Sequence, residues 1–169
     1  MAQAHPKPAL RPFLPADVPI LAAIFTASIE ELTGGDYSEA QQQAWMAAAE
    51  TEEFGKRLAA DLTLIATLEG SPVGFASLRG ADHIRMLYVH PAVAEQGIAT
   101  MLVDALERLA SSRGAEKLTV DASDTAQGFF AKRGYVAMQR NSITVNDEWL
   151  ANTTMQKTLG TGPASGALQ

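Results

Sequence analysis

Residues 84–109 combine a strand, a turn of small residues and a helix in an arrangement that could bind a phosphate group. Residues 84–89 are rich in β-forming side chains and all but Arg85 are apolar, and Pro91 ends this run because proline has no N–H to donate. Beyond the turn, apolar residues recur at helical spacing. Gly97 has no side chain and Ala99 the smallest one, so a ligand could approach this backbone closely. The first N–H groups of a helix lack intrahelical acceptors and carry partial positive charge, which favours an anion.

Two familiar nucleotide-binding motifs do not occur in this chain. There is no G-x-x-x-x-G-K-[ST] sequence, and no G-x-G-x-x-G follows a strand. A P-loop and a dinucleotide-binding unit therefore lose their main support. The alternative to a phosphate site is an ordinary strand–turn–helix unit without a ligand.

Length and composition limit the class of protein. We expect one domain over residues 1–169, with a core over about 8–159 and a flexible tail at 160–169. The absence of cysteine excludes disulfides, thiolate metal sites and an acyl-cysteine intermediate, and we expect no metal site. A net charge of −6 argues against nucleic acid and favours cationic or neutral substrates. Without a signal peptide or a membrane-spanning apolar run, we expect a soluble cytoplasmic protein with no membrane partner. The sequence leaves open whether the protein forms a homodimer.

The elements that must position the turn can be predicted from periodicity and turn signals. Three strands before the turn form an antiparallel meander, and the helix after it makes the next strand parallel to the strand at 84–89. This predicts an α/β (α+β) fold with a mixed, mostly antiparallel sheet of six or seven strands and about four helices. The expected strands are 8–13, 62–68, 73–78, 84–89, 117–120, 136–145 and 149–158, and the expected helices are 15–32, 39–49, 52–60, 97–113 and a short one capped by Asp124 or Ser123.

The central stretch resembles the main motif of the GCN5-related N-acetyltransferase (GNAT) superfamily. In that motif a strand L-Y-V-x-P runs into Q/R-x-x-G-x-G/A and an amphipathic helix. Ala94 departs from the pattern, because the superfamily usually has Gln or Arg there. The resemblance covers Ala9 to Leu159 and points to a bacterial branch of small, poorly specified acetyltransferases, with a sheet splayed at the central parallel pair. The matching residues are Leu87, Tyr88, Val89, Pro91, Gly97 and Ala99.

The resemblance implies acetyl-coenzyme A as the cofactor. Its pyrophosphate would rest on backbone amides of the turn, and the N–H of Leu87 would polarise the thioester carbonyl. Ser123 would hydrogen-bond the pantetheine arm, and Phe130 stands where many members have a tyrosine that protonates the leaving thiolate. The expected cofactor-binding residues are Leu87, Tyr88, Val89, Glu95, Gln96, Gly97, Ile98, Ala99, Thr100, Ser123 and Phe130.

A general base is needed because a protonated amine cannot attack the thioester. His83 occupies the place of a glutamate that serves as base in one branch of the superfamily. An imidazole titrates near pH ~6.5 and could accept a proton near neutrality. The alternative is a solvent-facing histidine beside a turn, and Asp121 and Glu30 are the other candidate bases.

In the superfamily the first helical pair lines the acceptor side, so the expected substrate residues are Glu31, Tyr37 and Trp45. Solvated charge and core packing are the alternative roles for these side chains. We expect an acetyl-CoA-dependent N-acetyltransferase that transfers the acetyl group directly to a primary amine of a small molecule or an amino-acid-like compound. The alternative is a non-catalytic module that binds acetyl-CoA.

Overall fold

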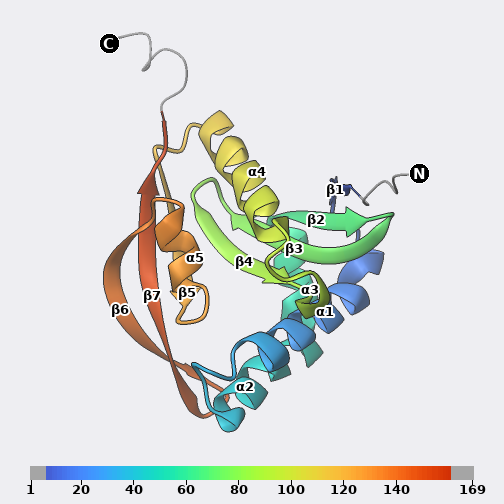
Figure 1. Ribbon diagram of the computed structural model, residues 1–169, viewed down its shortest axis with the longest axis vertical. Coiled ribbons are helices and arrows are strands. Elements are labelled where there is room, and N and C mark those ends of the chain that lie inside the picture. The colour runs from blue at the N-terminus through green and yellow to red at the C-terminus, as the bar shows by residue number, and fades with distance from the viewer. Residues whose placement is uncertain (1–6, 161–169) are drawn as a thin grey trace, which may run out of the picture.

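The computed structural model describes residues 7–160 of the chain (Figure 1). The end at residues 1–6 and nearly all of the predicted flexible tail lie outside the described residues. No helix within residues 7–160 is long and apolar enough to cross a membrane. The described part contains one seven-stranded sheet and five α-helices, which confirms the predicted fold class.

The sheet has the order β1-β2-β3-β4-β5-β7-β6, in which only β4 and β5 are parallel neighbours. The strands are β1 (Pro8–Pro12), β2 (Leu62–Leu68), β3 (Ser71–Arg79), β4 (His83–Val89), β5 (Lys117–Ser123), β6 (Val136–Val145) and β7 (Glu148–Thr158). The helices are α1 (Val18–Leu32), α2 (Glu39–Met46), α3 (Glu52–Ala60), α4 (Ile98–Ser112) and α5 (Gln127–Lys132). Short 3-10 helices are η1 (Pro15–Asp17), η2 (Ala47–Glu50) and η3 (Pro91–Val93).

Two apolar clusters hold the helices on opposite faces of the sheet. One contains the buried stripe of α4, including Leu102 and Leu106, together with Leu118 of β5. The other joins α1 and α3 to Ile65 and Phe75 of the first three strands. β4 has a β-bulge at Arg85, because Leu78 pairs with Ile84 whereas Ser77 pairs with Met86. The extra residue changes the face to which the following side chains point. Ile84 therefore belongs to the α4 cluster, and Met86 belongs to the α1 cluster.

The bulge in β4 is held by an ion pair. The Arg85 guanidinium donates to both carboxylate oxygens of Asp61, over 2.7 Å and 3.1 Å. The Asp61 side chain is only 2% exposed, so the ion pair with Arg85 is shielded from solvent on the carboxylate side. The pair therefore fixes the backbone of β4 just before its open end.

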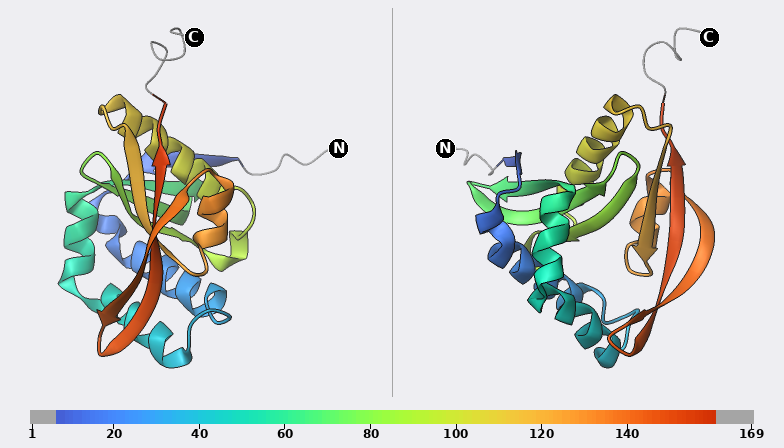
Figure 2. Two further views of the ribbon diagram at one scale, coloured as in Figure 1. Left: turned by 90° about the vertical axis from the view of Figure 1, so that its left-hand side faces the viewer. Right: turned by 180° about the vertical axis from the view of Figure 1, so that it is seen from behind.

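The sheet separates into two halves after the start of the parallel pair. β4 and β5 pair only through His83 with Thr119 and Ile84 with Val120, whereas β5 pairs with β7 along its whole length. Figure 2 shows β1–β4 and β5–β7 diverging, with α2 near the β6–β7 hairpin at the far end. Two hydrogen bonds join these segments: Gln41 Nε2 donates to Trp149 O, and Asn146 Nδ2 to Ala44 O. The predicted splay is thus present.

Candidate functional site

The turn before α4 has the geometry of an anion site. Gly97 is the N-cap of α4 and has φ +85°, and Glu95 has φ +63°. No acceptor among residues 7–160 takes a hydrogen bond from the N–H groups of residues 96–100. The first turn of α4 carries no acidic residue, so no side chain within that turn opposes its positive end. These amides can therefore hold a phosphate group.

The position of this turn is fixed by the packing of α4 on the sheet. Ile98 and Leu102 are buried against β3, where Gly74 permits close contact. A Cβ on Gly74 would lie 3.1 Å from both Ile98 Cγ2 and Tyr88 O, which leaves no room for a larger residue. The amide groups at the start of α4 are thus set rigidly beside the end of β4.

The open edge of β4 presents a backbone donor. His90 N–H donates to Val73 O, so Val73–His90 is a hydrogen-bonded pair of the antiparallel ladder. The alternation of such pairs makes Ala76–Leu87 a non-hydrogen-bonded pair, which turns the Leu87 N–H away from β3. That direction is the side from which β5 has departed, since β4 and β5 stop pairing at Ile84. The Leu87 N–H is thereby available to a carbonyl placed between the two strands.

His83 and Asp121 lie together where β4 and β5 begin to separate. The Nδ1 atom of His83 is 2.8 Å from Thr119 Oγ1, and Nε2 is 4.0 Å from Asp121 Oδ2. The Thr119 hydroxyl also lies 3.3 Å from Asp82 O, and when it donates there its oxygen accepts the Nδ1–H of His83. In the neutral ring the lone pair is then on Nε2, on the side of Asp121.

The surroundings of His83 favour its neutral form. Its side chain is only 14% exposed, and burial, followed by the nearby Arg79, lowers the pKa of His83 below the ordinary value. The Asp121 carboxylate opposes this shift. A histidine with a lowered pKa has its proton-accepting nitrogen free at neutral pH. The group can therefore serve as a base.

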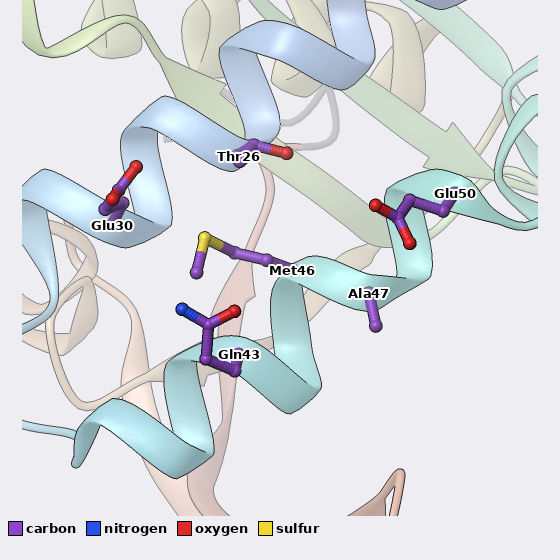
Figure 3. Close-up of a pocket in the computed structure, with 6 residues that line it drawn as sticks. All are labelled: Thr26, Glu30, Gln43, Met46, Ala47 and Glu50. Carbon is purple, nitrogen blue, oxygen red and sulfur yellow. The ribbon is translucent and has the colours of Figure 1, made fainter.

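Glu30, the third base candidate, lies in a different place. It lines a pocket between α1, α2 and η2 together with Thr26, Gln43, Met46, Ala47 and Glu50 (Figure 3). Neither His83 nor Asp121 lines this pocket. Glu31, the next residue on α1, is exposed. The structure therefore brings together two of the three base candidates.

Ser123 and Phe130 differ in their accessibility. Ser123, the last residue of β5, is partly buried, and its hydroxyl accepts a hydrogen bond from the Ala126 N–H. The Phe130 ring is 1% exposed and packs against Phe129 and Tyr135, with centroid distances of 5.2 Å and 5.1 Å. Phe130 is thus a core residue of the α4 cluster, and Phe129 beside it is only partly buried.

Tyr37 and Trp45 lie inside the molecule between the two sheet halves. Tyr37 is 6% exposed, and its hydroxyl is already hydrogen-bonded to protein atoms. Trp45 is partly buried and donates through Nε1 to the Tyr88 hydroxyl at 3.2 Å. Both Tyr37 and Trp45 are therefore held by contacts within the protein, at the end of the splay where β4 and β5 have separated.

Comparison with protein families decides among folds that could carry such a turn. The model of the acetyltransferase (GNAT) domain matches residues 34–159, which is most of the chain. The chain belongs to the GNAT acetyltransferase family. This confirms the resemblance found in the sequence and the predicted enzyme class of acyltransferase.

Relatives of this GNAT acetyltransferase are similar over most of their length. It is 31% identical to the uncharacterised N-acetyltransferase YafP of Escherichia coli over 147 residues, 87% of this chain and 93% of that protein. A GCN5-related N-acetyltransferase structure from Rhodopseudomonas palustris is 62% identical, with TM-score 0.89, over 94% of this chain and 99% of the other. A paiA N-acetyltransferase from Thermoplasma acidophilum, solved with coenzyme A, is 18% identical with TM-score 0.75, over 90% and 99% of the chains, and shares the fold.

Sequence reasoning missed several polar residues on the same sheet face of this GNAT acetyltransferase. Thr154 donates to Asp121 at 2.6 Å, and Asn141 donates to both Thr154 and Asn152. The alternation of polar residues along β7 could have indicated this polar surface, because every second side chain of a strand faces the same side. The same alternation in β5 places Thr119, the partner of His83, on the face that also carries Asp121.

Proposed function

We propose that this GNAT protein binds acetyl-CoA in the splay and transfers the acetyl group directly to a primary amine. The observation that carries the proposal is the left-handed Gly97 turn with its free amides, placed beside the open edge of β4. Solved GNAT-fold proteins support it, since one from Salmonella typhimurium, named yncA, was determined with its cofactor acetyl-CoA. When bound, acetyl-CoA supplies the thioester carbon that the amine attacks. The absence of cysteine leaves no thiol for a covalent acyl-cysteine route.

In this proposal the free amides of residues 96–100 hold the cofactor phosphates, with Glu95 at the rim of the turn. Leu87, Tyr88 and Val89 border the cofactor, and Ser123 faces it from the end of β5. The Leu87 N–H stabilises the negative charge that develops on the carbonyl oxygen. A donor in such a position typically contributes about 3 kcal/mol to the transition state.

His83 is proposed as the base that removes the proton of the amine, directly or through water. In the proposed tautomer the Nδ1–H is engaged with Thr119, which leaves the Nε2 lone pair of the neutral ring free. The carboxylate of Asp121, 4.0 Å away, stabilises the imidazolium once the proton has arrived. Glu30 has no such partner arrangement and is the weaker candidate.

The proposed acceptor is a small-molecule or amino-acid-like amine, encountered in the cytoplasm. The net charge of −6 favours a cationic compound. Polar groups near His83 offer the acceptor hydrogen-bonding partners, since Asp121, Thr154 and Asn141 lie on one face of the sheet. Glu31 is an exposed acidic residue of the helical segment.

An amine screen tests the proposed activity. Purified protein would be incubated with acetyl-CoA and a panel of amines, amino acids, aminoglycosides and peptides, and release of free thiol would be followed. We expect thiol release that depends on one class of amine, with an acetylated product in mass spectrometry. Binding of acetyl-CoA without turnover on any amine would instead indicate a non-catalytic binding module.

The burial of Phe130 leads to a prediction about the leaving group. Phe130→Tyr places a hydroxyl in the core, and burying an unpaired hydroxyl costs about 1–3 kcal/mol. We therefore expect a lower Tm and no gain in kcat, because a thiolate with a pKa near ~8.5 can leave without an acid. Calorimetry and kcat with one accepted amine check both parts. A hundredfold higher kcat in the tyrosine variant would show that protonation limits turnover and would contradict this prediction.

A further inference from the structure

The open end of the splay is bridged by side chains, although no backbone pairing connects the strands there. β4 and β5 stop pairing at Ile84 and Val120. Four residues further along each strand lie Tyr88 on β4 and Asp124 just after β5. Tyr37 and Trp45, from the segment between α1 and the end of α2, lie between these two points. We call these two residues the aromatic bridge.

Each contact of the aromatic bridge is direct. Trp45 Nε1 donates to the Tyr88 hydroxyl at 3.2 Å, and the Trp45 ring meets the Tyr37 ring edge-on, with centroids 5.4 Å apart. The Tyr37 hydroxyl accepts from the Asp124 N–H at 2.9 Å and donates to Ala151 O at 2.6 Å. A continuous set of contacts therefore runs from β4 through Trp45 and Tyr37 to the end of β5 and to β7.

The β4 end of the bridge is held by close aromatic packing. The Tyr88 ring packs against Phe25 and Phe75, with centroids 4.6 Å and 5.6 Å away. Burial raises the pKa of Tyr88 to about 12 and also raises the pKa of Tyr37. Both phenols are therefore neutral throughout the range in which an enzyme works. The hydroxyl of Tyr37 keeps its proton for Ala151 O and its oxygen for the Asp124 N–H.

We propose that the aromatic bridge sets the separation of β4 and β5 and thereby selects the length of the acyl chain that the protein accepts. The inference rests on the proposed function, in which the Leu87 N–H holds the thioester carbonyl. Leu87 is the neighbour of Tyr88, so the acyl chain attached to that carbonyl lies next to the β4 end of the bridge. A fixed separation admits an acetyl group and penalises each added methylene. Tyr37 and Trp45 act here as positioning and specificity residues.

A purely structural role for these residues predicts a different result. Other bonds also join the helical segment to the second half of the sheet, including Thr125 Oγ1 to Asp36 at 2.7 Å. If the bridge only stabilised the fold, its loss would weaken binding of every acyl-CoA by the same factor. If it sets the width, its loss changes the ratio between short and long acyl chains.

The test measures Kd by calorimetry for acetyl-CoA, propionyl-CoA and butyryl-CoA, which requires no acceptor. The bridge variants are Tyr37→Phe, which removes the hydroxyl, and Trp45→Phe, which removes the Nε1 donor. Tyr135→Phe is the matched control, because it also removes a buried tyrosine hydroxyl, bonded to Glu107 at 2.8 Å away from the splay. Thr125→Val is a second control, which cuts the bond to Asp36 and leaves the bridge intact.

We expect wild type to prefer acetyl-CoA over butyryl-CoA, which has two more methylenes, by roughly tenfold or more, since one methylene in a tight pocket already gives a discrimination of about that size. Both bridge variants should reduce that ratio to less than about threefold, and both controls should keep it. An unchanged ratio in the bridge variants, or no preference in wild type, would overturn the role of the bridge while leaving the proposed cofactor in place. Failure of wild type to bind acetyl-CoA would overturn the proposed function itself, and the bridge role with it.

Discussion

Gly97→Val is expected to abolish binding of acetyl-CoA. Gly97 has φ +85°, a conformation that a β-branched residue adopts only with strain, so the turn would change its course. Apart from its two chain neighbours, no atom of residues 7–160 would lie within 4 Å of a Cβ at this position, so the Cβ would project into open space at the turn that carries the free amides. A phosphate resting on those amides needs that space. The substitution therefore affects the site through both the backbone and the approach of the ligand.

Binding can be measured through the stability of the folded protein. Acetyl-CoA at a hundredfold its Kd should stabilise wild type by about 2.7 kcal/mol, and this shift should vanish in Gly97→Val. Gly114→Val is the matched control, because Gly114 follows the same helix with φ +87°, and its Cβ would likewise meet no atom of the described residues within 4 Å apart from its chain neighbours. The control should lose similar stability and keep the ligand-induced shift. An unchanged shift in Gly97→Val would remove this turn from the cofactor site.

The turn and the sheet could be predicted because their signals are local. Gly97, the apolar run of β4 and the amphipathic pattern of α4 lie within 26 consecutive residues, and the parallel pairing of β5 follows from the helical crossover. The observed boundaries of α4 differ by one residue at each end from the predicted helix 97–113, since Gly97 is the N-cap and Arg113 the C-cap. Capping residues are half inside a helix, so differences of this size are expected.

The contacts across the splay could not be predicted, because they join residues far apart in sequence. Trp45 and Tyr88 are 43 positions apart, and Tyr37 and Ala151 are 114 apart. Aromatic residues at these positions indicate burial in general and do not identify a hydrogen-bonding partner. The same limit applies to Glu30, whose residue type suits a base. Its position in the pocket between α1, α2 and η2 depends on how these helices pack.

The β-bulge at Arg85 is a further feature without a clear signal in the sequence. A bulge shifts the alternation of faces by one residue, so Ile84 and Met86 face opposite clusters although they are two positions apart. Strand alternation alone would have placed both on one face. The ion pair between Arg85 and Asp61 that holds the bulge joins residues 24 positions apart, and it becomes apparent only once α3 is packed on the sheet.

His83→Gln is expected to lower kcat by about a hundredfold or more, the usual contribution of a general base. Glutamine keeps a polar group near Thr119 but cannot accept a proton from an amine. Because burial lowers the pKa of His83, the wild-type acidic limb of the kcat/KM profile should lie below pH ~6.5, since activity falls only when the imidazole becomes protonated. This limb should disappear in His83→Gln. His90→Ala is the control, because His90 caps η3 through a bond from Ala92 N–H and should leave the limb in place.

Asp121→Asn tests the same assignment through the pH profile. The Asp121 carboxylate raises the pKa of His83 against the effect of burial, so removing its charge should lower that pKa further. The acidic limb should therefore move to lower pH in Asp121→Asn, while kcat falls because the imidazolium formed in the reaction loses its neighbouring charge. If Asp121 were itself the base, the same substitution would remove the limb, and His83→Gln would leave it. Near-wild-type kcat with an unchanged limb in His83→Gln would exclude His83 as the base.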